Sequence, residues 1–578
     1  MKKILLGNEA IARGAYEAGV KVSTAYPGTP STEITEAIAK YEEIYVEWSP
    51  NEKVALEVAI GSSVAGARSI VCMKHVGVNV AADPLFTLAY TGVNGGLVLV
   101  VADDPGMHSS QNEQDSRYYA IANSIPMLEP SDSSEAKEYT KIAFEISEKY
   151  DTPVMLRSTT RVSHSQSFVD LEDRCEVGVK PYIKDITKYA MMPSMAIGRH
   201  KVVEERIKKL STDSNSLSIN KTTYKSTKIG IICSGVVAKY AEEAIPDASI
   251  LKLGMVNPLP LKMIREFANK VDKLYVIEEL EPIFETQIKA QGIDCIGKEI
   301  FSIQGEISVA IIRNKLLGEP IPQADIALPV RPPVMCPGCP HRSVFYVLHK
   351  LKLMVTADIG CYTLGAGQPL NAVDTVVCMG ASIGMCHGVD KALGREQSKK
   401  TVAVIGDSTF VHSGITGVVD AVYNQGSSTI IILDNSTTGM TGHQPNPATG
   451  RTIRDQVTHQ LNLEQVVRAC GVNSVQIVDA YDMVAVEKAV KEELAKDEVS
   501  VIIARKPCVL LTKEVKSPYY IDSDKCKKCG MCMKIGCPAI MMAKDKSVSI
   551  KADQCVGCGV CVQMCKFDSI KLGGKTNG

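Results

Sequence analysis

Eight cysteines near the end of the 578-residue chain restrict its fold more than any other feature. They form two motifs, C-x2-C-x2-C-x4-C-P and C-x2-C-x2-C-x3-C. Three thiolates spaced three residues apart on a tight loop can reach three corners of one cubane, and the distant fourth cysteine of each motif ligates the other cluster. The spacing therefore predicts two [4Fe–4S] clusters, one held by Cys526, Cys529, Cys532 and Cys565 and the other by Cys555, Cys558, Cys561 and Cys537.

Two departures from the usual spacing concern the fourth cysteines. The first motif has one extra residue before Cys537, and Cys565 is followed by Lys566 where a proline is usual. We expect the extra residue to bulge the loop, so the ligand role of Cys537 depends on how that bulge is accommodated. A zinc ribbon would need two C-x2-C pairs and would leave four cysteines unexplained. A ferredoxin domain moves single electrons, and the rest of the chain must supply their source.

Nineteen cysteines could also indicate the disulfides of a secreted protein. However, Asn8, Glu9 and Arg13 interrupt the apolar start before it reaches the length of a signal peptide, and no other stretch approaches the roughly 18 apolar residues of a membrane helix. We therefore expect a cytoplasmic protein of a reducing cell. The net charge of −1 suggests neither nucleic acid nor a membrane as a partner.

The chain is too long for one hydrophobic core, and we expect several α/β domains followed by a small α+β domain. Short β-rich runs, such as Leu97–Val101, alternate with helix-like stretches, such as Ser49–Arg68, in three regions. Residues 211–227 are rich in Ser, Thr, Asn and Lys, which predicts a linker. The expected boundaries are 1–190, a connecting segment and linker at 191–227, 228–328, 329–512, and the cysteine-dense 513–578.

Oxygen-bearing side chains follow two apolar strands of the third α/β region. Gly406, Asp407 and Ser408 come after the strand 401–405, and Asn435 and Thr437 close the next strand. Near-octahedral Mg²⁺ prefers oxygen ligands, and here a carboxylate, an amide oxygen and the backbone carbonyl of Thr437 can supply them. Gly406 would let the backbone approach a diphosphate. Alone, G-D-S after a strand also fits an ordinary turn.

With the asparagine at this distance, the pattern resembles the thiamine-diphosphate fingerprint, in which G-D-G is followed by N-N. Several further segments are similar to cofactor-contacting segments of the 2-oxoacid:ferredoxin oxidoreductases: 336–342 (CPGCPHR), 358–361 (DIGC), 380–384 (GASIG) and 438–445 (TGMTGHQP). The resemblance implies that thiamine diphosphate with Mg²⁺ is bound by Cys336, Gly338, Cys339, His341, Asp358, Gly360, Cys361, Gly380, Ser382, Gly384, Gly406, Asp407, Ser408, Asn435, Thr437, Gly439 and His443, with Asp407, Asn435 and Thr437 on the metal.

The N-terminal segments 26–33 (YPGTPSTE) and 51–55 (NEKVA) are similar to pyrimidine-binding motifs of the same family. The resemblance implies that Glu52 hydrogen-bonds the aminopyrimidine and promotes its proton exchange, whereas Glu57 ranks lower. The alternative is a solvated carboxylate in the first turn of a helix. By its family position Thr29 meets the substrate carboxylate, although a turn-capping threonine fits equally well. His75 and His108 face substrate or solvent.

Other interpretations remain open for Cys336 and Cys339, which could be buried structural cysteines or, less readily, metal ligands. His341 and His443 are candidate polar contacts to the cofactor. The resemblance names the domains: pyrimidine-binding (1–190), transketolase C-terminal-like (228–328), diphosphate- and Mg²⁺-binding (329–512) and 2[4Fe–4S] ferredoxin (513–578).

The fused C-terminal ferredoxin makes the domain order most similar to that of indolepyruvate:ferredoxin oxidoreductase α subunits. This resemblance implies oxidative decarboxylation of aryl 2-oxoacids to acyl-CoA and CO2, with coenzyme A as co-substrate, ferredoxin as electron acceptor and a smaller β subunit, as a heterodimer or its dimer. A pyruvate or other aliphatic 2-oxoacid oxidoreductase is the alternative within the class. The clusters disfavour a non-oxidative decarboxylase, and Asp407 with Asn435 disfavours a pure electron-transfer module.

Overall fold

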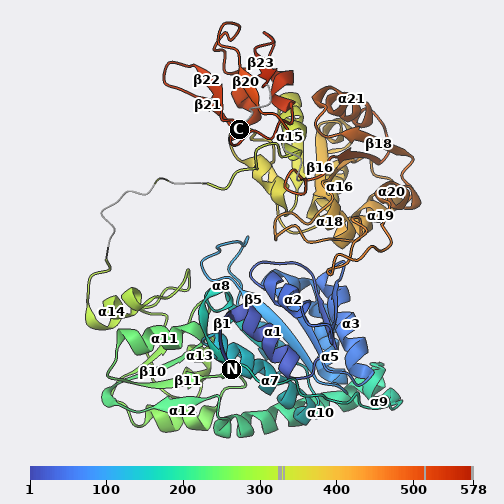
Figure 1. Ribbon diagram of the computed structural model, residues 1–578. Coiled ribbons are helices and arrows are strands. Elements are labelled where there is room, and N and C mark those ends of the chain that lie inside the picture. The colour runs from blue at the N-terminus through green and yellow to red at the C-terminus, as the bar shows by residue number, and fades with distance from the viewer. Residues whose placement is uncertain (323–328, 330–331, 513–515, 574–578) are drawn as a thin grey trace. The chain divides into compact units, whose positions relative to one another are not determined.

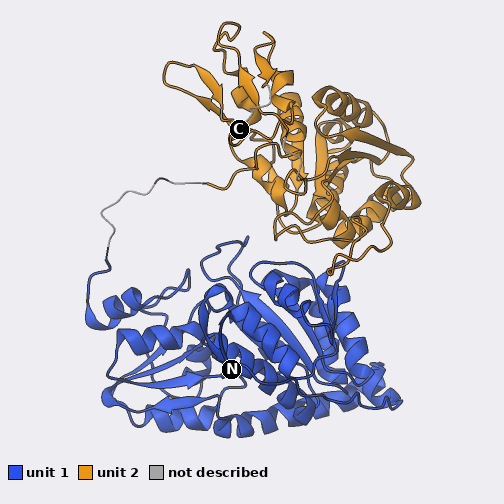
Figure 2. Ribbon diagram, viewed as in Figure 1, with its two compact units in different colours: residues 1–327 blue, residues 328–578 orange. Residues whose placement is uncertain are grey.

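The computed structural model describes residues 1–322, 329, 332–512 and 516–573. It divides the chain into two compact units, residues 1–327 and 328–578 (Figure 2). The expected boundaries at 328/329 and 512/513 adjoin residues outside the described ranges. Each unit is an α/β structure, as the alternation of strands and helices predicts. In the described ranges no helix combines the length and the apolar character needed to cross a lipid bilayer.

The larger sheet of unit 1 has seven strands in the order β12-β6-β7-β5-β4-β2-β3. All neighbours are parallel except β12 and β6. Its central strands are buried along their whole length because helices cover both faces (Figure 1). The strands are β2 (Val22–Ala25), β3 (Tyr45–Trp48), β4 (Ser69–Lys74), β5 (Leu97–Asp103), β6 (Met127–Leu128), β7 (Val154–Thr159) and β12 (Met255–Asn257).

The helices of this region connect the strands or extend along them. They are α1 (Gly7–Glu17), α2 (Thr32–Ile38), α3 (Glu52–Val64), α4 (His75–Val80), α5 (Ala82–Thr91), α6 (Arg117–Asn123), α7 (Ser133–Tyr150), α8 (Thr160–His164), α9 (Ile186–Tyr189) and α10 (Pro193–Asp213). Strand β1 (Lys2–Leu6) pairs with β8 (Gln166–Asp170) in a separate two-stranded sheet.

The second sheet of unit 1 has the order β13-β10-β11-β9. Its strands are β9 (Lys221–Thr223), β10 (Ser226–Ser234), β11 (Ala248–Leu253) and β13 (Leu274–Ile277), with helices α11 (Gly235–Ala244), α12 (Leu261–Ala268), α13 (Ile283–Lys289) and α14 (Val309–Leu317). Residues of both sheets, such as Leu99 and Leu251, share one core cluster.

The prediction of a linker at 211–227 is wrong. Helix α10 continues to Asp213, β9 pairs with β11, and Ile219 is buried. The polar residues have structural roles that composition does not reveal: the side-chain oxygen of Asn220 accepts from the backbone nitrogens of Gly254 and Met255 at 2.9 and 3.0 Å. A short edge strand held by such bonds needs little apolar sequence.

The large sheet of unit 2 is parallel throughout, in the order β15-β14-β16-β17-β19-β18. Its strands are β14 (Met354–Ala357), β15 (Thr375–Val376), β16 (Thr401–Gly406), β17 (Thr429–Asp434), β18 (Ser474–Asp479) and β19 (Ser500–Arg505). The helices are α15 (His341–Leu351), α16 (Ala381–Leu393), α17 (Arg395–Ser398), α18 (Asp407–Thr409), α19 (Ile415–Tyr423), α20 (Leu463–Ala469) and α21 (Met483–Leu494).

The cysteine-dense part of unit 2 contains two small antiparallel pairs of strands. Strand β20 (Tyr519–Ile521) pairs with β23 (Ile570–Leu572), and β21 (Ile540–Met542) pairs with β22 (Val548–Ile550). A short 3₁₀ helix contains the third cysteine of each motif: Met531–Ile535 contains Cys532, and Val560–Met564 contains Cys561. Apolar residues of this part, including Ile535 and Val560, share a core cluster with Val344 and Leu348 of α15. The ferredoxin part is therefore packed onto the parallel-sheet part within unit 2.

Candidate cofactor-binding sites

Three oxygen-bearing groups converge where β16 and β17 end in unit 2. Asp407 is the first residue of α18, and Asn435 and Thr437 follow β17; all three are buried. The end of the Asn435 amide lies 2.9 Å from the Thr437 carbonyl oxygen and 3.1 Å from Asp407 Oδ1. In the rotated orientation, the amide nitrogen donates to both of these oxygens. The three residues can supply a carboxylate, an amide oxygen and a backbone carbonyl oxygen, which are ligands that Mg²⁺ prefers, so the residues fit Mg²⁺.

The electrostatics of Asp407 point the same way. Burial, followed by the charge of nearby Asp434, raises the pKa of Asp407 to about 8. Its Oδ1 accepts from the Ser408 nitrogen at 2.8 Å, whereas its Oδ2 has no hydrogen-bond partner among the described residues. A buried carboxylate with one unsatisfied oxygen is costly unless a cation or proton pairs with it. Bound Mg²⁺ would supply that charge.

Asp358 organises a second polar group at the end of β14. This fully buried carboxylate accepts hydrogen bonds from Ser382 Oγ at 3.0 Å, from the Gly380 nitrogen at 3.2 Å and from the Tyr362 hydroxyl. Burial raises the pKa of Asp358 to about 7. Of the residues expected to contact the cofactor, Asp358, Gly380 and Ser382 are thus brought together, and they fix the start of α16.

Tyr362 is a residue of this region that the sequence patterns did not reveal. Its ring fills the space beside two glycines: a Cβ added to Gly360 or Gly406 would lie 2.3 or 2.7 Å from the ring. Gly406 therefore makes room for an aromatic ring, a role in addition to the expected close approach of a diphosphate. The ring also meets His341 edge-on, with centroids 6.2 Å apart. Burial lowers the pKa of His341 to about 4, so this imidazole is neutral.

Further predicted residues surround the oxygen cluster. A Cβ on Gly439 would lie 3.4 Å from Cys361 Sγ and 3.6 Å from Asn435 Nδ2. Ser408 Oγ accepts from the Thr438 hydroxyl at 2.9 Å. His443 lies in the same loop with a φ of 67°, whereas Gly384 has open space where a Cβ would be. Cys361, Ser408 and Gly439 are thus gathered at the oxygen cluster, and contacts for Gly384 and His443 stay predictions.

In unit 1, Glu52 and Thr29 lie at the same edge of the large sheet, after β3 and β2 respectively. Glu52 is the first residue of α3 and only 4% exposed, which excludes the solvated-carboxylate alternative. A Cβ on Gly77 would lie 2.7 Å from Glu52 Oε1, so the carboxyl group packs closely on the start of α4. Asn51 caps α3 by accepting from the Val54 nitrogen at 2.9 Å.

The loop that carries Thr29 is closed by its neighbours. The hydroxyl of Ser31 donates to the Gly28 carbonyl at 2.7 Å, and the Gly28 nitrogen donates to the Thr32 hydroxyl at 2.9 Å. Thr29 itself is half-buried. These hydrogen bonds of the turn come from Gly28, Ser31 and Thr32, and the role of Thr29 toward a substrate stays a prediction.

The two histidines singled out in this unit differ. His75 is buried after β4 and places its Nε2 3.1 Å from Asn112 Oδ1, while burial lowers its pKa. His108 lies on the surface, with Nε2 3.2 Å from Glu306 Oε2.

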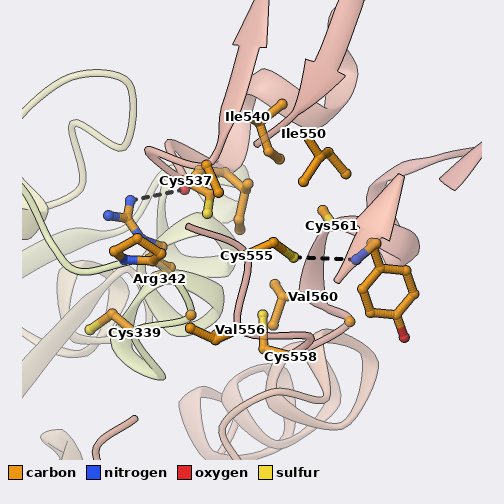
Figure 3. A pocket seen from close by; sticks show the side chains of 16 residues that line it. Cys339, Arg342, Cys537, Ile540, Ile550, Cys555, Val556, Cys558, Val560 and Cys561 are labelled. Carbon is orange, nitrogen blue, oxygen red and sulfur yellow. Dashed lines mark hydrogen bonds between the residues drawn. The ribbon is translucent and has the colours of Figure 1, made fainter. Parts of the chain in front are cut away.

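The eight clustered cysteines line two cavities of the ferredoxin part. One cavity is lined by Cys526, Cys529, Cys532 and Cys565. The other is lined by Cys537, Cys555, Cys558 and Cys561, together with Cys339 (Figure 3). This is the same grouping as the crossed pairing expected from the spacing. In the described ranges, no three His, Cys, Asp or Glu side chains lie close enough together to hold a metal ion. Ligation of the clusters therefore stays a prediction, which rests on the cavity that each cysteine lines.

The extra residue before Cys537 is accommodated at Gly536. The 3₁₀ helix Met531–Ile535 ends at this glycine, which has a φ of 69°. Only glycine adopts such a conformation without strain, and the turn returns Cys537 to its cavity.

The Cys336–Cys339 segment contacts the ferredoxin part directly. The Gly338 carbonyl accepts from the Tyr481 hydroxyl at 2.6 Å, and a Cβ on Gly338 would lie 2.2 Å from Val556 Cγ2. Cys336 is exposed, and Cys339 is one of the residues that line a cysteine cavity. The expected place of this segment beside a thiamine cofactor stays a prediction. The Val556 contact is with the loop that carries Cys555 and Cys558, whereas Tyr481 belongs to the parallel-sheet part.

Three family models match the chain. Residues 13–217 match the thiamine-diphosphate-binding region of pyruvate flavodoxin/ferredoxin oxidoreductases, residues 358–504 the C-terminal TPP-binding domain of thiamine pyrophosphate enzymes, and residues 518–566 a 4Fe-4S dicluster domain. The second match contains Asp407 and Asn435, and the third contains all eight clustered cysteines. The cofactors expected from the sequence, thiamine diphosphate and iron–sulfur clusters, agree with these matches.

Curated relatives match nearly the whole chain. The indolepyruvate oxidoreductase subunit IorA of Archaeoglobus fulgidus is 41% identical over 99% of this chain and 97% of its own length. That of Thermococcus kodakarensis is 40% identical over 98% and 96%. A solved 2-oxoglutarate:ferredoxin oxidoreductase from Magnetococcus marinus covers 55% of this chain and 65% of its own, with a TM-score of 0.48 and 17% identity. On the full-length matches, this chain belongs to the indolepyruvate oxidoreductase subunit IorA family and is an oxidoreductase of 2-oxoacids.

Proposed function

We propose that this chain oxidatively decarboxylates aryl 2-oxoacids such as indolepyruvate. The overall reaction converts the 2-oxoacid and coenzyme A to acyl-CoA, CO2 and one proton, and passes two electrons singly to ferredoxin. The observation that carries the substrate class is the 41% identity, along nearly the full length, to a protein named for indolepyruvate. The redox chemistry is supported by the two cysteine-lined cavities, which lie in the same unit as Asp407, Asn435 and Thr437.

Unit 1 and unit 2 each contain residues that are expected to contact the cofactor. In unit 2, Asp407, Asn435 and Thr437 would hold Mg²⁺, which would neutralise charge on a bound diphosphate. In unit 1, Glu52 would serve as the group that exchanges a proton with the aminopyrimidine, and Thr29 would hydrogen-bond the substrate carboxylate. When bound, thiamine diphosphate supplies an electron sink for the carbon that loses CO2. The Cys336–Cys339 segment holds the ferredoxin part against the diphosphate-binding part.

The proposal extends to partners and location. The curated relatives are named as subunits, which supports a smaller β subunit as partner in a heterodimer or its dimer. Ferredoxin is the external electron acceptor. The cytoplasm is the proposed location, because open cysteine clusters of this kind persist in a reducing compartment.

Steady-state turnover of the anaerobically purified complex tests the substrate class. Ferredoxin reduction is compared for indolepyruvate, phenylpyruvate, pyruvate and 2-oxoglutarate, each with coenzyme A. We expect kcat/KM for both aryl substrates to exceed that for pyruvate at least tenfold, about 1.4 kcal/mol of preferential transition-state binding. Preference for pyruvate or 2-oxoglutarate would keep the reaction class and reject the aryl assignment. Release of an aldehyde with the clusters left oxidised would point to a non-oxidative decarboxylase.

A further inference from the structure

Arg342 is a buried cation between the two parts of unit 2. It is the second residue of α15, only 4% exposed, and it lines the cavity that also contains Cys537, Cys555, Cys558 and Cys561 (Figure 3). The expected cofactor-binding residues include its neighbours Cys339 and His341, but the proposed function gives Arg342 no role. Burying a guanidinium is costly, so contacts of Arg342 with its surroundings must compensate for the lost hydration.

All the hydrogen bonds of Arg342 go to backbone carbonyl oxygens. Its Nε donates to Cys336 at 3.2 Å, and one terminal nitrogen donates to Met335. The other terminal nitrogen donates to Ile535 at 3.4 Å and to Gly536. The side chain thus joins the segment before α15 to the turn that immediately precedes Cys537. The planar fork of donors suits this task, which a lysine could perform only in part.

The carbonyls satisfy the donors of Arg342 but leave its charge without a carboxylate. Among the described residues, no Asp or Glu forms a salt bridge with it, whereas other buried arginines pair with carboxylates, as Arg117 does with Asp115 and Arg157 with Asp103. Burial lowers the pKa of Arg342, and the thiols of Cys537, Cys339, Cys336 and Cys558 act in the opposite direction. The groups that can carry negative charge near this guanidinium are therefore cysteines, two of which, Cys537 and Cys558, are expected cluster ligands.

A cluster bound by four thiolates is negatively charged, and reduction adds one more negative charge. A nearby cation in a low-dielectric interior favours the reduced form more than the oxidised form, because Coulomb energy grows with the charge it acts on. The other cavity, lined by Cys526, Cys529, Cys532 and Cys565, does not have Arg342 among its lining residues. Any effect of Arg342 on reduction should therefore differ between the two clusters.

We propose that Arg342 is a positioning residue that holds the turn before Cys537 and raises the reduction potential of the cluster in the Cys537 cavity relative to the other cluster. The proposal rests on the proposed function only in assuming that clusters fill both cavities. It assigns to this side chain the task of making one cluster the better electron acceptor. The potential can be measured with chemical reductants, so the test does not depend on the identity of the 2-oxoacid.

The test is a mediated redox titration of the full complex, followed by electron paramagnetic resonance, for the parent and three variants. Arg342→Gln removes the charge and part of the donor fork. Arg342→Lys keeps the charge and should restore most of the potential. Lys534→Gln is the matched control, because it removes one positive charge from an exposed position of the same turn, where water screens it.

For Arg342→Gln we expect the midpoint potential of one cluster to fall by about 59 mV, which corresponds to a tenfold change in its one-electron reduction equilibrium. The reduction equilibrium of the second cluster should change less than threefold. In Lys534→Gln, the equilibria of both clusters should also change less than threefold. Equal shifts of both clusters, or no shift with full iron content, would overturn the proposal. If Arg342→Gln fails to load iron, Arg342→Met is titrated instead, and loss of iron in both neutral variants would also overturn the electrostatic role. If the parent complex does not turn over any 2-oxoacid but Arg342→Gln still lowers the potential of one cluster as expected, the result would count against the proposed function alone.

Discussion

At the scale of single residues, the two carboxylates with proposed cofactor roles differ in what surrounds them. Asp407 is a buried carboxylate with one unsatisfied oxygen that a cation or a proton can pair with, whereas Glu52 packs on the start of α4. The sequence could suggest both, because Asp407 follows an apolar strand and Glu52 falls in a motif similar to a known family. Burial decided between the alternatives for Glu52: a solvated carboxylate would not be 4% exposed at a helix start.

Replacing Glu52 with Gln tests its proton-exchange role. Glutamine keeps the size and one acceptor but cannot take up a proton, so we expect the hydrogen–deuterium exchange at C2 of bound thiamine diphosphate to slow about 10²- to 10⁴-fold. Rapid-quench NMR of the loaded complex measures this rate. Binding of the cofactor, measured separately, should change little.

Glu57→Gln is the matched control on the same helix. Glu57 is exposed and forms an i,i+4 pair with Lys53, so its loss should leave the exchange rate at the parental value. Equal slowing in both variants, or parental exchange in Glu52→Gln, would show that Glu52 does not carry out this step.

At the scale of elements, strand and helix positions followed largely from hydrophobic patterns. The expected runs Leu97–Val101 and 401–405 lie within β5 and β16. The missed elements were the polar ones. Strand β9 is three residues long and is recognisable only through its pairing with β11, which no local pattern encodes.

The C-x4-C spacing of the first cysteine motif predicts that Cys537, which follows the 3₁₀ helix Met531–Ile535 and Gly536, is a cluster ligand. Five cysteines line the cavity concerned, of which Cys537 is an expected ligand and Cys339 belongs to the parallel-sheet part. We expect Cys537→Ser to lower iron and acid-labile sulfide from two clusters to one, because a cubane needs four ligands. Cys339→Ser should retain both clusters.

Chemical analysis of iron and sulfide in the anaerobically purified variants gives the answer. A full complement of iron in Cys537→Ser together with a loss in Cys339→Ser would mean that the extra residue displaces Cys537, and that Cys339 takes its place on the cluster.

At the scale of the whole molecule, the sequence could predict the set of cofactors but not the contacts between domains. Tyr362 lies outside the segments singled out in the sequence, and Arg342 ends the segment 336–342, whose resemblance gave this arginine no role. Arg342 meets carbonyls 193 and 194 residues later in the chain, and the Tyr362 hydroxyl contacts Thr409, 47 residues later. Such roles depend on tertiary packing, which spacing along the chain cannot reveal.

The central claim is that oxidation of an aryl 2-oxoacid and reduction of the clusters are coupled within this protein. The most direct test is a single turnover: the anaerobic complex, with oxidised clusters and bound thiamine diphosphate, is mixed with indolepyruvate in a stopped-flow instrument without ferredoxin. We predict bleaching of the visible iron–sulfur absorbance, completed on addition of coenzyme A. Absorbance that stays unchanged with indolepyruvate, although dithionite bleaches the same sample, would contradict the account.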